Sequence, residues 1–153
     1  MKHFFYPIAV IFFLSIFVVG STFASDRMAE HDTAGKDRIG DLIHESVVDG
    51  YMLSYYFMDL RDQKTDHAEK ESMDTPHHLM VYIMDETHQP ILDGKVGFLI
   101  KGADGKTQKA MGMFMSEGFG ITADMKKKGT YTISTKAVIG KKKLMDSFHY
   151  QIE

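Results

Sequence analysis

The sequence contains no cysteine, and tryptophan and asparagine are absent as well. The lack of cysteine excludes disulfides, zinc–thiolate sites, iron–sulfur clusters and a cysteine nucleophile. The lack of asparagine excludes an N-glycosylation acceptor. Even in an oxidising compartment such a chain cannot form disulfide bonds, so packing alone must stabilise its fold.

A strong excess of charge of either sign is also missing. The 153 residues include 18 Lys and Arg against 21 Asp and Glu, which gives a formal net charge of −3. Nucleic-acid binding normally requires a basic face, so this balance argues against a nucleic acid as a partner. The length corresponds to one domain, with or without a short export segment.

Enzyme motifs are missing too. The sequence has no G-x-S-x-G motif, no phosphate-binding G-x-x-x-x-G-K-[ST] motif and no dinucleotide-binding G-x-G-x-x-G motif. His44-Glu45 lacks the second histidine of the zinc-binding motif H-E-x-x-H. Carboxylates are plentiful, but they lie in polar segments that give no sign of burial, so a raised pKa cannot be argued for them. We therefore expect a protein that binds rather than catalyses.

Residues 1–24 have the pattern of a secretory signal peptide. Lys2 supplies the positive charge, the stretch 8–19 is apolar apart from Ser15, and Thr22-Phe23-Ala24 offers small residues before Ser25. No Asp, Glu, Lys or Arg occurs from 3 to 25, so an uncleaved membrane anchor is the alternative. We expect a bacterial periplasmic or secreted protein that contacts a membrane, if at all, only through this segment.

The rest of the chain divides into a leader and one domain. Residues 25–38 are polar and without a period, which predicts a flexible leader, and residues 39–153 form a single domain with an exposed charged loop over 61–76. Asp49-Gly50 lies between two apolar runs, which is the strongest short signal for a hairpin. The segments 42–48 and 51–60 should therefore pair as antiparallel strands.

From residue 77 onward the sequence is a series of short strands with turn signals between them. The predicted strands cover 79–85, 95–101, 109–115, 119–125, 130–139 and 147–152. The segment 130–139 alternates most cleanly, and no long segment has a 3.6-residue period. The pattern predicts an all-β fold, an antiparallel immunoglobulin-like β-sandwich of about 7–8 strands.

The C-terminal part resembles small periplasmic β-sandwich domains. Gly129-Thr130-Tyr131-Thr132-Ile133, followed by a turn and Phe148-x-Tyr150-x-Ile152, is similar to the closing strands of YtkA-like and FixH-like domains. More distantly, residues 76–153 are similar to copper-resistance domains of the CopC type. The resemblance implies a sandwich fold and, through the CopC type, copper. CopC-type copper sites use a histidine directly after the cleavage point, where this chain has Ser25.

Methionine is abundant and forms one notable motif, M-x-M-x-M, at Met111, Met113 and Met115. If 109–115 is a single strand, the three thioethers share one face and lie about 6.5–7 Å apart. Thioethers are soft ligands that suit Cu(I), and two or three of them with a histidine make a copper site. The alternatives are a methionine face that fills the core and an adaptable methionine-rich binding surface.

Histidine supplies the other candidate ligands. His77 and His78 stand at the entry of a predicted strand, and adjacent strand residues point to opposite faces, so we expect one of them to bind a metal. Met73 in the preceding loop and His44 on the first hairpin complete the candidate set. Beyond the predicted signal peptide, the other histidines lie in polar segments, turns or outward positions and should be solvated: His31, His67, His88 and His149.

Two functions fit these observations. The first is an exported metal-handling domain, with copper as its cofactor and the histidines and methionines above as ligands. The alternative is a structural or interaction module that docks onto a protein partner in an envelope or membrane complex through the aromatic strand Tyr51–Leu60. The lysine runs 126–128 and 141–143 fall in predicted turns, where lysine is normally solvated.

Overall fold

The computed structural model describes residues 38–63 and 73–153. The predicted signal peptide, nearly all of the leader, the middle of the 61–76 loop, His31 and His67 lie outside these residues. The chain divides into two units, and every described residue belongs to the second, Ala34–Glu153. Within the described part of the chain, no helix is long and apolar enough to cross a membrane.

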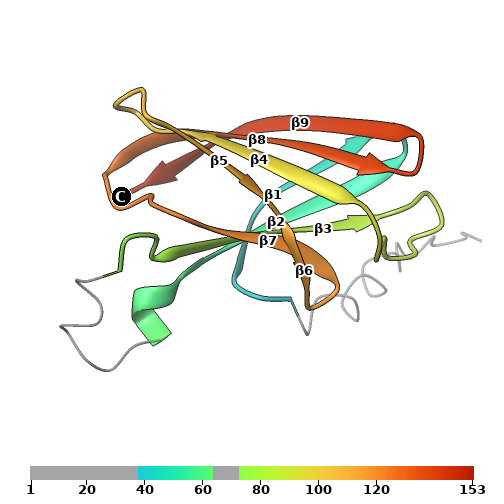
Figure 1. Cartoon of the computed structure of the whole chain (residues 1–153), viewed down its shortest axis with the longest axis horizontal. Helices are drawn as coiled ribbons and strands as arrows, with labels where there is room; N and C mark the ends of the chain where they lie inside the picture. Colours follow the sequence, from blue (N-terminus) through green and yellow to red (C-terminus); the bar gives the residue numbers. More distant parts are fainter. Residues whose placement is uncertain (1–37, 64–72) are drawn as a thin grey trace, which may run out of the picture. The chain divides into compact units, whose positions relative to one another are not determined.

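Nine strands and one short 3-10 helix make up the described residues. In chain order they are β1 (Asp41–Val48), β2 (Tyr51–Asp59), η1 (Leu60–Gln63), β3 (His77–Met84), β4 (Lys95–Lys101), β5 (Thr107–Met111), β6 (Met113–Met115), β7 (Gly118–Ala123), β8 (Gly129–Ile139) and β9 (Lys142–Ile152). They form two antiparallel sheets, which Figure 1 shows as two layers. Sheet A has the order β1-β2-β3-β7-β6, and sheet B has the order β5-β4-β8-β9.

The predicted all-β sandwich is confirmed. Each sheet turns alternate apolar side chains toward the other, as in β4, where Val96, Phe98 and Ile100 are buried between exposed or half-buried neighbours. Alternation of this kind is what a two-layer sandwich requires, because successive side chains of a strand point to opposite faces. The core contains mainly aliphatic and aromatic residues, among them Leu53, Tyr55, Leu79, Val81, Ile83, Ile121, Met125, Tyr131, Ile133 and Leu144.

The first hairpin is also confirmed. β1 and β2 pair antiparallel up to Val48 and Tyr51, with Asp49 and Gly50 as the two-residue turn. Their φ angles are 49° and 83°. Two positive φ values match the right-handed twist of the flanking strands, and Asp and Gly are the residues that tolerate them. A second two-residue turn, Gly140-Lys141, joins β8 to β9, so the last strand begins at Lys142 and not at 147.

The expectation of one strand over 109–115 is wrong. β5 pairs with β4 in sheet B, whereas β6 pairs with β7 in sheet A, and the chain changes sheet at Gly112. The Gly112 amide donates a hydrogen bond to the carbonyl of Val96 at 2.7 Å. A β-carbon at Gly112 would lie 3.1 Å from Phe98 and 3.2 Å from Phe119. A side chain at this position would therefore force Phe98 or Phe119 to shift. Figure 1 shows the chain passing from β5 in one layer to β6 in the other. Met111 and Met113 thus belong to different sheets.

Candidate functional site

The outer face of sheet A is unusually well buried along its central strand. In β3, His78, Met80 and Tyr82 point away from the sandwich core, yet they are only 9%, 0% and 5% exposed. The other side of the strand, with Leu79 and Val81, belongs to the core. Both faces of β3 are therefore covered, as the apolar sequence of this strand predicts.

A glycine in the neighbouring strand makes room for two of these side chains. Gly120 of β7 pairs with Met80. A β-carbon built on Gly120 would overlap the Met80 sulfur and lie 2.8 Å from His78 Nε2. The thioether sulfur and the imidazole nitrogen thus occupy the same small space over Gly120, and each is positioned by its own place on β3. Glycine permits this close approach because it has no side chain.

Two more methionines adjoin this space. Met113 of β6 is the pairing partner of Gly120 on the side away from β3, and Met58 of β2 is the partner of His78. Directly opposite residues on antiparallel strands share a face, with β-carbons about 4.5–5.5 Å apart. Met113 is 66% exposed on the edge strand of the sheet, whereas Met58 is half-buried. We call His78, Met80, Met58 and Met113 the His–Met cluster.

The chemistry of the His–Met cluster is that of a soft ligand set. Burial lowers the pKa of His78 below its usual value, so its imidazole is neutral and can act as a ligand at neutral pH. The other potential donors are uncharged thioether sulfurs, which favour Cu(I) over Zn²⁺, Mg²⁺ or Ca²⁺. Among residues 38–63 and 73–153, no group of three or more His, Asp or Glu side chains could hold a metal ion.

His77 lies on the opposite side of β3 from His78, as strand alternation predicts. Its Nδ1 accepts a hydrogen bond from the Met125 amide at 3.1 Å. Its Nε2 lies 3.7 Å from Asp59 Oδ2. Asp59 in turn accepts hydrogen bonds from the Arg61 guanidinium, which lowers the Asp59 pKa. His77 is only 2% exposed, and one of its ring nitrogens already accepts a backbone hydrogen bond. Its position is therefore structural.

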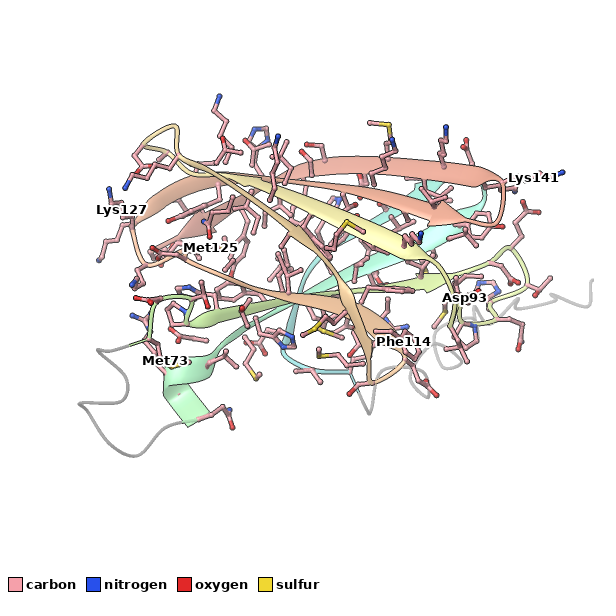
Figure 2. The ribbon with its side chains drawn as sticks, in the orientation of Figure 1. Met73, Asp93, Phe114, Met125, Lys127 and Lys141 are labelled. Atoms are coloured by element: carbon pink, nitrogen blue, oxygen red, sulfur yellow. The ribbon has the colours of Figure 1, made fainter. Side chains whose placement is uncertain are left out.

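Three other candidate residues lie apart from the His–Met cluster. His44 stacks on Phe148 with ring centroids 4.2 Å apart, where β1 meets β9. Met73 accepts a hydrogen bond from Lys126 Nζ through its backbone carbonyl, at the end of the sandwich that Figure 2 marks with Met125 and Lys127. Met111 is 62% exposed and belongs to sheet B.

Met115 shares the outer face of sheet A with Met113 but lies two residues further along β6, next to a different pair of neighbours. It pairs with Gly118. A β-carbon on Gly118 would lie 2.9 Å from the Tyr82 ring, so the tyrosine covers this glycine much as Met80 and His78 cover Gly120. Figure 2 shows Phe114, which lies between the two methionines in sequence, at the lower right of the sandwich, away from Met73. Of the predicted ligands, the structure thus brings His78 and Met113 together.

Met80 and Met58 were missed by the sequence reasoning. The signal for Met80 is local, because His78 and Met80 are two residues apart on a strand and must share a face. The glycines at 118 and 120 were a second signal, since alternate glycines on a strand mark a face that something else approaches closely. Met58 carries no such signal, because its place opposite His78 depends on the pairing of β2 with β3.

The aromatic strand proposed as a docking surface is β2, an interior strand of sheet A. Tyr55 is fully buried, and its hydroxyl lies 2.6 Å from Thr135 Oγ1 across the core. Tyr56 lies on the outer face, where the Arg38 guanidinium sits 5.5 Å from its ring centroid. Tyr51 is covered by Lys142 at 4.7 Å from its ring centroid. These rings are engaged within the domain.

Comparison with known proteins supports the fold. No protein-family model and no curated protein matches the sequence. The chain is similar to a copper-bound variant of FetP from uropathogenic Escherichia coli strain F11, with a TM-score of 0.53 and 11% identity over 73% of this chain and 95% of that one. A DUF4426 family protein from Pseudomonas aeruginosa PAO1 is similar with a TM-score of 0.53 and 12% identity over 72% and 96% of the two chains. These likenesses concern the β-sandwich; a relation to YtkA-like and FixH-like domains stays a prediction.

Proposed function

We propose that this protein is an exported, non-catalytic copper-handling domain that binds Cu(I) at the His–Met cluster on the outer face of sheet A. The observation that carries the proposal is the convergence of Met80 Sδ and His78 Nε2 over Gly120. Met113 and Met58 stand opposite the two residues of that pair and supply further thioethers. The export segment predicted at residues 1–24 places this chemistry in the periplasm or outside the cell.

The donor set supports Cu(I) in particular. Neutral sulfur and imidazole ligands leave the positive charge of the ion uncompensated, which a monovalent ion tolerates better than a divalent one, and thioethers match the softness of Cu(I). His78 is kept neutral by burial, so a proton competes poorly for Nε2. Met113 stands on a three-residue edge strand and is mostly exposed, which gives the ion a route in and out.

The copper-bound FetP structure is consistent with this proposal, because it places copper on a sandwich of similar fold. At 11% identity it does not indicate which residues of this chain would bind the ion. The ligand assignment therefore rests on the side chains around Gly120.

The test is a titration of the purified protein with Cu(I) against a chromophoric chelator, with Cu(II) and Zn(II) in parallel. We expect one Cu(I) per chain and weak binding of the divalent ions. The variant Met80→Leu/Met113→Leu, which keeps side-chain volume, should lose affinity by at least about 100-fold because two thioethers are gone.

The matched control is Met111→Leu/Met145→Leu, which removes two exposed methionines from sheet B. It should bind Cu(I) like the wild type. Equal loss in both double variants would mean that thioethers bind copper independently of their position. Full retention in Met80→Leu/Met113→Leu would overturn the assignment of the site.

A further inference from the structure

Among the residues that the structure describes, the strands of sheet B place lysines and no carboxylate on its outer face. The pairing of β5, β4, β8 and β9 defines which side chains share this face. One row across the sheet is Met111, Gly97, Lys136 and Met145, and the next is Lys109, Leu99, Ser134 and Ser147. Five lysines on the four strands belong to this face: Lys95, Lys101, Lys109, Lys136 and Lys143.

These five lysines differ from two neighbouring lysines that lie close to carboxylates, Lys127 and Lys142. All five are exposed, and within residues 38–63 and 73–153 none of them forms an ion pair. By contrast, Lys127 pairs with Asp104 at 2.8 Å, and Lys142 lies 4.0 Å from Glu86. In a chain of formal charge −3, one face of one sheet therefore holds a local excess of five positive charges.

The centre of the same face is apolar and open. A hollow of about 450 Å³ lies over Gly97 and is lined by Leu99, Met111, Met145 and the aliphatic parts of neighbouring lysines. The side chains of Leu99, Met111 and Met145 are 38%, 62% and 69% exposed. The backbone groups of this face are already paired within the sheet, so an incoming peptide strand finds no hydrogen-bond partners on it.

An apolar centre ringed by dispersed lysines fits a membrane surface. Lysine side chains reach anionic headgroups while apolar side chains between them enter the interfacial region. A single bound anion would require positive charges that converge on one point. The five lysines are instead spread over all four strands. The negative net charge of the chain does not prevent this contact, because charges more than about 8–10 Å away are screened at physiological salt.

The geometry points to the outer face of sheet B as a docking surface for membranes that contain anionic lipid. The contact is formed by Lys109 on β5 and Lys136 on β8, the two strands that flank β4, and is supported by Lys95, Lys101 and Lys143 near the ends of their strands. It is distinct from any contact through the N-terminal segment. It also leaves the His–Met cluster free, because that cluster is on the outer face of the other sheet.

The experiment is sedimentation of the purified protein with vesicles of phosphatidylcholine alone or with about one third phosphatidylglycerol. We expect binding to the anionic vesicles only, weakening as salt is raised. Lys109→Glu/Lys136→Glu should reduce binding by about tenfold or more. The control Lys128→Glu/Lys141→Glu changes the net charge equally in exposed turns and should bind nearly as well as the wild type; circular dichroism verifies that both variants are folded.

Three results would overturn the proposal. The first is an absence of binding to anionic vesicles at low salt. The second is equal loss in the two double variants, because it would reflect net charge and not this face. The third is binding of polyglutamate, dependent on Lys109 and Lys136, without vesicle binding; that result would assign the surface to an acidic protein segment.

Discussion

The outer faces of the two sheets use similar residues for different purposes. On sheet A, Met80 and His78 are buried over Gly120, and neutral donors gather in one place. On sheet B, Met111 and Met145 are exposed at the two ends of a row whose inner residues are Gly97 and Lys136. A methionine paired with a glycine is therefore not a metal site by itself. The residue on the far side of the glycine decides whether a metal can bind: it is Met80 on sheet A and Lys136 on sheet B.

The contrast is sharpest for Met111 and Met113, which are two residues apart in sequence. The crossing at Gly112 places the first on sheet B, next to lysines, and the second on sheet A, next to a buried histidine. A cation would be repelled from the first position and attracted to donors at the second. The M-x-M-x-M motif is thus divided between a positively charged environment and an uncharged one.

The largest expected effect comes from exchanging Gly120 of sheet A for alanine. Gly120→Ala pushes its β-carbon into the space of Met80 Sδ and His78 Nε2, so we expect the free energy of unfolding to fall by about 1–3 kcal/mol. Cu(I) affinity should fall in parallel because both donors are displaced. Chemical denaturation and the chelator titration measure the two effects.

Gly97→Ala is the matched substitution on sheet B. Its β-carbon would meet only Met111 Sδ, at an ordinary 3.6 Å. We expect unchanged or slightly higher stability, by up to about 0.5–1 kcal/mol, since glycine in a strand is entropically unfavourable. If the two alanine variants were equally destabilised, the packing of Met80 and His78 over Gly120 would not require glycine there.

A smaller effect is expected at the crossing between the sheets. A β-carbon at Gly112 would lie 3.1 Å from Phe98, 3.2 Å from Phe119 and 3.3 Å from the Val96 carbonyl. Gly112→Ala should therefore destabilise the fold by about 1–2 kcal/mol, because core side chains and backbone must shift. Thermal melting measures the loss. A melting temperature equal to the wild type would show that the crossing does not depend on glycine.

Acid should weaken the fold gradually, through the two adjacent histidines of β3. Burial lowers the pKa of both His77 and His78 in the folded state, whereas the unfolded chain takes up protons near the ordinary value of about 6.5. Stability is thus unaffected above that pH and falls as the pH drops below it, because the unfolded state then binds more protons.

The measurement for this prediction is the free energy of unfolding between about pH 7.5 and 5. His77→Gln/His78→Gln should flatten the loss at acidic pH relative to the wild type. The control His149→Gln removes an exposed imidazole from sheet B and should leave the slope as it is. A double variant with the wild-type slope would contradict the role of these two histidines.

Local features of the sequence were enough to predict the fold class and the first hairpin. Alternation within strands such as 95–101 and 130–139 predicted the sandwich, and Asp49-Gly50 predicted the first hairpin, because both signals depend on neighbouring residues. The division of 109–115 was not predictable in this way. Each half looks like a strand, and only the packing of Gly112 against Phe98 and Phe119 determines that the chain changes sheet there.

The candidate site was predictable only in part, for the same reason. His78 and Met113 were among the expected ligands, and strand alternation separated His78 from His77. Their meeting depends on two pairings that join distant segments, β3 with β7 and β7 with β6. The place of Met58 beside His78 also depends on strand register. The same holds for the basic face of sheet B, since its five lysines are scattered between 95 and 143 and form no run in the sequence.

The most direct test of Cu(I) binding at the His–Met cluster is a crystal structure of the Cu(I)-loaded protein, with anomalous scattering recorded at the copper edge. We expect one copper over Gly120, about 2.0–2.4 Å from His78 Nε2 and Met80 Sδ, with Met113 or Met58 as a further ligand. Copper bound at Met111 or Met145 on sheet B, or at His77 or His44, would contradict it.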